Sequence, residues 1–152
     1  MAHETLDQPY RGGFVGPEHH FALTVYFEDT DAYRVVYYAN YLKFMERARS
    51  DMIRAVGVDQ NSELERTGSA YVVVEVNIRY VKPARLGDEL VVVSTVEQVR
   101  AASVQIQQRV MRSGELLTDA RVTAAFLDAN GRPQRQPKAW VEKFKGITKQ
   151  TV

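Results

Sequence analysis

The 152-residue chain contains no cysteine, and its three histidines stand at positions 3, 19 and 20. Without cysteine, disulfides, thiol nucleophiles and thiolate metal sites are excluded. Because no histidine follows position 20, an imidazole general base in the body of the fold is excluded too. We therefore expect any base or nucleophile that works in catalysis to be a carboxylate.

The chain also lacks an excess of charge and a long apolar run. Its 20 lysines and arginines balance 19 acidic residues, for a net charge of +1, so no general attraction to nucleic acid is expected. No apolar segment approaches the roughly 20 residues of a membrane span, and the N-terminus lacks the basic and apolar regions of a secretory signal. These absences predict a cytoplasmic protein with no nucleic-acid partner and no membrane span.

Several common site motifs are missing as well. The sequence has no glycine-rich phosphate loop, no His-Glu pair at metal spacing and no Gly-x-Ser-x-Gly elbow. His19 and His20 are adjacent, but no third ligand stands at a suitable spacing, so we interpret them as surface residues. The sequence therefore predicts no metal site and no cofactor.

The length of the chain suits a single domain with a real core. We place that domain at residues 18–145. The polar residues 1–17, which contain several glycines and prolines, are expected to form a flexible leader, and residues 146–152 to form a C-terminal tail.

One long amphipathic helix is predicted from Tyr41 to Val56. Apolar residues recur there at spacings of three or four, and Gly57 is a residue type that commonly ends helices. The helix would have about five turns. Its apolar face requires a broad partner surface.

Five segments with strand-like patterns supply that surface. One is valine-rich on both faces and looks central, and the others favour an antiparallel sheet with one buried face. The predicted fold class is α+β, with one long central helix wrapped by a five-stranded antiparallel sheet. A short closing helix is expected near the C-terminus. The predicted strands are Phe21–Phe27, Tyr71–Tyr80, Glu89–Val99, Ser103–Met111 and Asp119–Leu127, and the closing helix is Pro137–Lys145.

A dense group of acids lies between the first strand and the long helix. Glu28, Asp29 and Asp31 fall within four positions and are followed by apolar and aromatic residues. A carboxylate beside the free N–H groups of a helix N-terminus is an arrangement that thioester chemistry could use. The same acids are typical of helix caps, so the residues alone leave both interpretations open.

This segment resembles the signature of the hotdog-fold thioesterases of the 4-hydroxybenzoyl-CoA thioesterase family. It is most similar to the Tol-Pal-associated acyl-CoA thioesterase branch. The resemblance covers nearly everything from Phe21 to Pro137. It is carried by Asp29-Thr30-Asp31-Ala32, Val35-Val36-Tyr37-Tyr38-Ala39-Asn40-Tyr41-Leu42, Glu46-Arg47-Ala48-Arg49, Asn77-Ile78-Arg79-Tyr80, Pro83-Ala84-Arg85-Leu86-Gly87-Asp88 and Gly131-Arg132-Pro133.

The resemblance implies a role for individual residues. Asp31 matches the catalytic carboxylate, as nucleophile or general base, and the N–H near Tyr38 matches the donor that polarises the thioester carbonyl. Val36 and Tyr37 would contact the acyl group, and these side chains would suit either an aliphatic or an aromatic acyl chain. Arg100 matches the first residue of a basic cluster that holds CoA phosphates in one branch, although a solvated turn residue is the alternative interpretation.

The implied function is that of an acyl-CoA thioesterase, releasing a free acid and CoA. The implied partners are the acyl-CoA substrate, acyl carrier protein and further copies of the chain, in a homodimer or homotetramer with active sites at subunit interfaces. The chain departs from the Tol-Pal branch at Tyr33-Arg34, where Gly-Gly is usual, and at Tyr38, where histidine is usual. The alternative is therefore a non-catalytic acyl-CoA or acyl-carrier-protein binding module. A hotdog dehydratase is disfavoured because it would need a histidine in the body of the fold.

Overall fold

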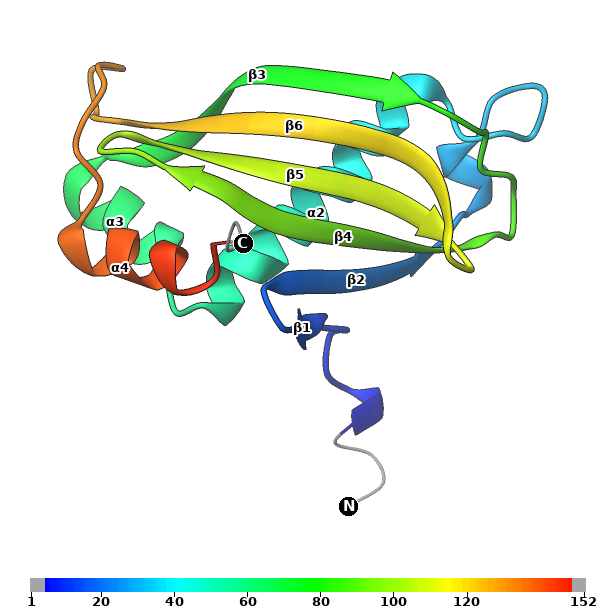
Figure 1. The fold of residues 1–152 in the computed structure, drawn as a ribbon, viewed down its shortest axis with the longest axis horizontal. Coiled ribbons are helices and arrows are strands. Elements are labelled where there is room, and N and C mark those ends of the chain that lie inside the picture. Colours follow the sequence, from blue (N-terminus) through cyan, green and yellow to red (C-terminus); the bar gives the residue numbers. More distant parts are fainter. Residues whose placement is uncertain (1–4, 149–152) are drawn as a thin grey trace.

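A curved antiparallel sheet wraps around one long helix, α2 (Tyr41–Ala55), which passes behind the strands in Figure 1. The computed structural model describes residues 5–148. The predicted α+β arrangement of one long helix and one antiparallel sheet is confirmed. The sheet has six strands in the order β1-β2-β4-β5-β6-β3. They are β1 (Gly13–Val15), β2 (Glu18–Thr24), β3 (Ala70–Tyr80), β4 (Glu89–Val99), β5 (Ser103–Arg112) and β6 (Glu115–Leu127).

The prediction of five strands is wrong, because part of the expected leader forms β1. Gly16, at a φ of 58°, and Pro17 reverse the chain so that Phe14 lies opposite His19 in an antiparallel pair. Glycine and proline in this segment therefore build a tight turn between two strands. The first predicted strand is also shifted, since β2 ends at Thr24.

His19 is buried, which corrects its interpretation as a surface residue. Its side chain is 0% exposed, and its Nε2 lies 2.8 Å from Oδ2 of Asp51 on α2. The same carboxylate oxygen accepts the backbone N–H of Gly12 at 2.9 Å. This group ties the first two strands to the helix.

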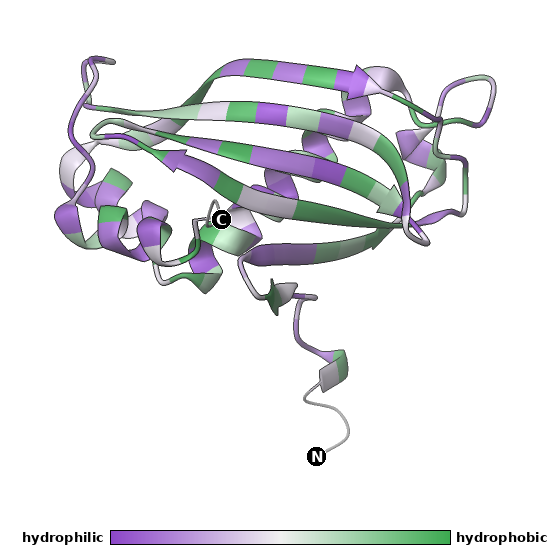
Figure 2. Ribbon diagram, viewed as in Figure 1, coloured by the Kyte–Doolittle hydropathy of each residue, from purple (hydrophilic) through white to green (hydrophobic). Residues whose placement is uncertain are grey.

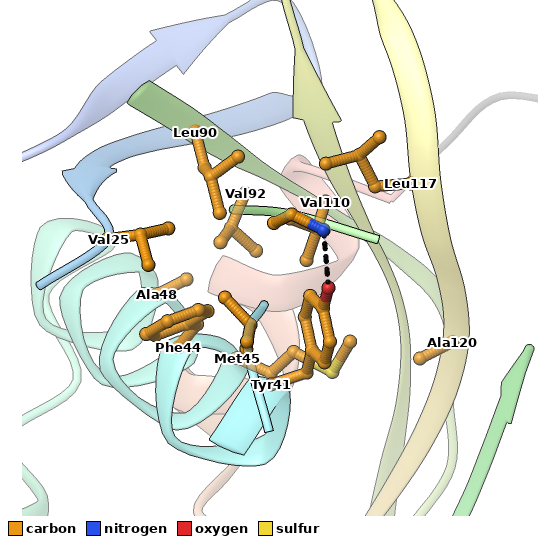
Figure 3. Close-up of a cluster of buried hydrophobic side chains, with 12 residues drawn as sticks. Val25, Tyr41, Phe44, Met45, Ala48, Leu90, Val92, Val110, Leu117 and Ala120 are labelled. Atoms are coloured by element: carbon orange, nitrogen blue, oxygen red, sulfur yellow. Dashed lines mark hydrogen bonds between the residues drawn. The ribbon is translucent and has the colours of Figure 1, made fainter. Parts of the chain in front are cut away.

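Helix α2 supplies much of the core, as its periodicity predicts. Phe44, Met45 and Ala48 are buried, and Figure 3 shows them facing Leu90 and Val92 of β4. The helix has 15 residues, about four turns, and Gly57 follows it at a φ of 91°. The predicted end of the helix is confirmed to within one residue.

Strand β4 lies inside the sheet, between β2 and β5, which confirms its predicted central position. Residues 92–96 are buried without interruption, so this strand is covered on both faces. Along β5 and β6 the burial alternates, and Figure 2 shows the matching alternation of hydrophobic and hydrophilic residues.

Strand β3 behaves differently, because it forms an edge of the sheet. The prediction of one buried face is wrong here. Val72, Val73, Val74 and Val76 are all exposed, and Val74 is 59% exposed. A β-bulge between Val73 and Glu75 interrupts the pairing with β6. An apolar, exposed edge strand is a surface that proteins usually cover.

Two further helices lie together at one end of the sheet in Figure 1. The closing helix α4 (Lys138–Gly146) is confirmed, and its Phe144 is fully buried. The helix α3 (Gln60–Thr67) was not predicted. No helix among residues 5–148 is long and apolar enough to cross a membrane. Residues 149–152 of the predicted tail lie outside the described range.

Candidate active site

The acidic segment forms a compact loop between β2 and α2. It contains two single-turn 3-10 helices, η1 (Phe27–Asp29) and η2 (Tyr38–Asn40), and η2 runs directly into α2. Between them the chain makes a small hairpin in which Thr30 pairs with Val36. Asp31 is the first residue of the turn that closes this hairpin, since its carbonyl accepts the N–H of Arg34.

Asp29 has a structural role in this loop. Its Oδ2 accepts the N–H of Tyr26 at 2.8 Å, and its Oδ1 accepts the side-chain amide of Asn40 at 2.9 Å. Its backbone carbonyl accepts the N–H of Tyr37 at 3.0 Å. Asp29 therefore joins η1 to η2, and both of its carboxylate oxygens are occupied.

Asp31 is held differently. Its Oδ1 accepts the N–H of Tyr33 at 2.9 Å, and its backbone carbonyl accepts the N–H of Arg34 at 2.9 Å. These bonds fix the carboxylate on its own turn. Within residues 5–148, Oδ2 of Asp31 has no hydrogen-bond donor and the carboxylate forms no ion pair. One oxygen thus remains available for chemistry.

The turn keeps its tight shape without glycine. Arg34 adopts a φ of 62°, in the left-handed region where glycine is favoured. Its backbone is held there from two sides, since its N–H bonds Asp31 and its carbonyl accepts the N–H of Leu86 at 2.9 Å. Tyr33 and Arg34 therefore reproduce a glycine-type turn at a cost in strain.

Two backbone donors lie at the start of η2. The N–H groups of Tyr38 and Ala39 find no acceptor within hydrogen-bond distance among the described residues. Such groups are expected in the first turn of a helical segment, where no preceding turn supplies carbonyls. Asp31 and these donors belong to one loop, because Tyr37 is bonded back to Asp29.

A second loop, residues 83–88, supports the first. The N–H of Val36 donates to the carbonyl of Ala84 at 2.8 Å, and the N–H of Ala84 donates to the Tyr41 hydroxyl at 3.1 Å, the dashed line in Figure 3. Asp88 accepts from Arg112 at 2.7 Å. Burial opposes ionisation of Asp88, but the Arg85 N–H and the Arg112 guanidinium outweigh it and lower its pKa.

The aromatic residues of the loop form a connected group. Tyr37 and Tyr38 are about half exposed or more, with ring centroids 5.0 Å apart. Tyr80, at the end of β3, lies edge-on to Tyr38 at 6.2 Å, and its hydroxyl donates to the Tyr38 carbonyl at 2.8 Å. Val36 is only 5% exposed and packs in the core. The sequence assigned Tyr80 no role; its signals were its place at the end of an alternating strand and in one of the segments that carry the family resemblance.

Arg100 lies far from this loop within the chain. It follows β4, whose first residue, Glu89, pairs with Thr24 just before the loop. Eleven strand residues separate the two ends, a span of roughly 35 Å. Among residues 5–148, the Arg100 side chain forms one hydrogen bond, to Gln98 at 3.2 Å. A single chain therefore does not bring Arg100 to Asp31.

A groove of about 460 Å³ runs between α2 and the strands β3, β5 and β6. Leu42, Glu46 and Arg49 line it from the helix, and Val73 and Val76 line it from β3. Among residues 5–148, no group of three histidine or acidic side chains is placed to hold a metal ion.

The loop thus combines a fixed carboxylate with one free oxygen and unpaired N–H donors. Hydrolases that act on a carbonyl group use such a carboxylate and such donors. The long helix wrapped by a curved antiparallel sheet is the arrangement of a hotdog fold. The sequence matches the Thioesterase-like superfamily over residues 25–146. Because this match spans most of the chain, the protein belongs to that superfamily, which confirms the predicted thioesterase class.

Individual relatives agree with this assignment. The acyl-CoA thioesterase YbgC of Haemophilus influenzae is 42% identical over 108 residues, covering 71% of this chain and 79% of the relative. The acyl-CoA thioester hydrolase YbgC of Escherichia coli is 38% identical over 126 residues, covering 81% and 92%. A crystal structure of a probable thioesterase from Bartonella henselae has a TM-score of 0.75 at 31% identity, covering 79% of this chain and 99% of that one.

Proposed function

We propose that this protein is an acyl-CoA thioesterase and that Asp31 is its catalytic carboxylate. The observation that carries the assignment is the free Oδ2 of Asp31, on the same loop as the unpaired N–H groups of Tyr38 and Ala39. The similarity to acyl-CoA thioester hydrolases supports the substrate class.

The reaction follows from these groups. The thioester carbonyl oxygen binds the N–H of Tyr38, which stabilises the negative charge that develops on it. In one route Asp31 takes a proton from water, and the resulting hydroxide attacks the carbonyl carbon. In the other, Oδ2 attacks directly and water then hydrolyses the anhydride. The CoA thiolate leaves as the tetrahedral intermediate collapses in the first route and as the anhydride forms in the second, and both routes then release the free acid.

Replacing Asp31 by asparagine tests the assignment. The asparagine side chain would keep an oxygen to accept the Tyr33 N–H, so we expect stability close to that of the wild type. Turnover should fall by about 100-fold or more, because the base or nucleophile is lost. Hydrolysis of short-chain, long-chain and aromatic acyl-CoAs, followed by thiol release, measures the effect.

Glu28→Gln is the matched control. Glu28 is exposed and stands three positions before Asp31, so this variant also removes one negative charge from the loop. It should retain wild-type turnover. Unchanged turnover in Asp31→Asn would remove Asp31 from the mechanism. If the wild type binds acyl-CoAs but hydrolyses none of them, the non-catalytic binding module is favoured instead.

We also infer that two copies of the chain pair to form the working enzyme. The exposed valines of β3 and the adjoining groove support this, because a second copy would cover both. An active site shared between copies would let Arg100 of one copy approach Asp31 of another. A tetramer, an acyl-carrier-protein partner, the Tol-Pal branch and a cytoplasmic location stay predictions of the sequence resemblance and composition.

A further inference from the structure

We propose that Tyr80 is a positioning residue for the carbonyl-binding donors, acting through the Tyr38–Ala39 peptide. This inference rests on the proposed thioesterase function and extends it to a residue outside the acidic loop. The Tyr80 hydroxyl donates to the backbone carbonyl of Tyr38 at 2.8 Å, across 42 positions of sequence.

The geometry of a peptide group explains how this contact reaches the substrate. In a planar trans peptide the carbonyl and the N–H point in opposite directions. The carbonyl of Tyr38 shares its peptide plane with the N–H of Ala39, and no described peptide bond is cis. By holding the carbonyl, Tyr80 therefore fixes the direction of the unpaired Ala39 N–H on the other side.

The neighbouring peptide is held in the same manner. The carbonyl of Tyr37, which shares its plane with the N–H of Tyr38, accepts the N–H of Asn40 at 2.7 Å. Each unpaired N–H thus belongs to a peptide whose carbonyl is hydrogen-bonded. The peptide of the Tyr38 N–H is held by Asn40, and that of the Ala39 N–H is held by Tyr80. A donated hydrogen bond also polarises the peptide and strengthens its N–H as a donor.

The Tyr80 ring has its own supports. Its centroid lies 6.2 Å from the ring of Tyr38 and 5.6 Å from that of Tyr41, in edge-on contacts. Partial burial, with the nearby phenols of Tyr38 and Tyr41, raises the pKa of Tyr80 above its usual value. The hydroxyl accordingly stays protonated and able to donate over the neutral pH range.

Tyr80→Phe tests the proposal, because phenylalanine keeps the ring contacts and removes only the donor. We expect kcat to fall about tenfold, less than the roughly 10²–10³ lost with an oxyanion donor itself, since the N–H groups remain. KM should stay within about twofold, because the lost interaction acts in the transition state.

Tyr71→Phe is the matched control. It makes the same change on the same strand, where the Tyr71 hydroxyl donates to Gln136 at the opposite end of β3. Because Gln136 is buried, this variant should lose at least as much thermal stability as Tyr80→Phe. It should nevertheless keep the wild-type kcat, which separates a positioning role from a structural one.

Infrared spectroscopy of the bound thioester measures how strongly the N–H donors polarise its carbonyl group. In the Asp31→Asn background, an acyl-CoA with a ¹³C-labelled thioester carbonyl should show a lowered C=O stretching frequency when bound, because hydrogen bonds weaken that bond. Adding Tyr80→Phe should reduce this shift, whereas adding Tyr71→Phe should leave it unchanged.

Equal kcat and equal carbonyl shifts in Tyr80→Phe and the parent protein would overturn the positioning role while leaving the thioesterase function intact. Equal losses of kcat in Tyr80→Phe and Tyr71→Phe would also overturn it, by assigning both effects to stability. Absence of hydrolysis by the wild type would overturn the proposed function itself, and with it any role of Tyr80 in that reaction.

Discussion

Arg34 shows at the residue scale how this loop holds an unfavourable backbone conformation. Its φ of 62° costs a residue with a side chain roughly 1 kcal/mol relative to glycine. We expect Arg34→Gly to raise the free energy of unfolding by up to about 0.5 kcal/mol, because the greater freedom of the unfolded chain offsets part of the relief of strain. Urea denaturation measures the difference.

Tyr33→Gly is the control for this prediction. Tyr33 is next to Arg34 and exposed, but its φ is not positive, so glycine there only adds unfolded-state entropy and should destabilise the protein. If both glycine variants lose stability equally, Arg34 stores no strain.

The sequence alone does not show which acid of the loop is free to act in catalysis. Glu28, Asp29 and Asp31 are interchangeable by type and spacing, and only the family resemblance selected Asp31. Their environments differ because Asp29 is bonded to Asn40, eleven positions away, whereas the only donor to the Asp31 carboxylate within residues 5–148 comes from its own turn. A pattern of neighbouring residues does not contain such a contact.

At the element scale, predictions succeeded where a periodic pattern coincided with one-sided burial. Helix α2 and strands β5 and β6 satisfy that condition, and β4 was recognised by its valines on both faces. β3 has the same alternation as β5 and β6 but lies at the sheet edge, so strand order, a long-range property, decides its burial. The short helix α3 was missed because it buries no residue and therefore has no apolar stripe to detect.

The docking of β1 and β2 onto α2 depends on a buried histidine and should be sensitive to acid. A carboxylate can only accept, so Nε2 of His19 carries the proton in the bond to Asp51. Protonation would add a proton to Nδ1, which is buried and has no partner among the described residues. Burial therefore lowers the pKa of His19, against the opposing attraction of Asp51.

The direction of the pH effect follows from this lowered pKa. As pH falls below 6.5, the value of an unperturbed histidine, the unfolded chain binds a proton before the native protein does. Stability should be complete above pH 6.5 and fall below it, by at most about 1.4 kcal/mol per pH unit for one proton.

Unfolding free energies measured from about pH 7.5 to about pH 5, a range that brackets the ordinary histidine pKa, test this prediction. His19→Gln keeps a donor for Asp51 but binds no proton, so the slope should flatten. His20→Gln removes the more exposed neighbour and should keep the wild-type slope. A slope that is identical in all three proteins would exclude His19 as its source.

At the scale of the whole molecule, the two edges of the sheet are unequal. β1 is a three-residue edge, whereas β3 offers eleven residues with exposed valines beside the groove along α2. Short edges resist pairing and long apolar edges invite it. The pairing of copies that we propose therefore belongs at β3, whose last residue, Tyr80, contacts the loop that carries Asp31.

Val74→Lys tests that arrangement, because a charged side chain on an edge strand blocks pairing with another strand. Val74 is exposed and lies at the bulge, so the variant should fold with little loss of stability. We expect the wild type to sediment as a dimer or larger assembly and Val74→Lys as a monomer with little thioesterase activity.

Val15→Lys makes the same change on the opposite edge, in β1, and should leave mass and activity unchanged. A Val74→Lys monomer with full activity would confine the active site to one chain, and an undisturbed assembly would place the interface elsewhere.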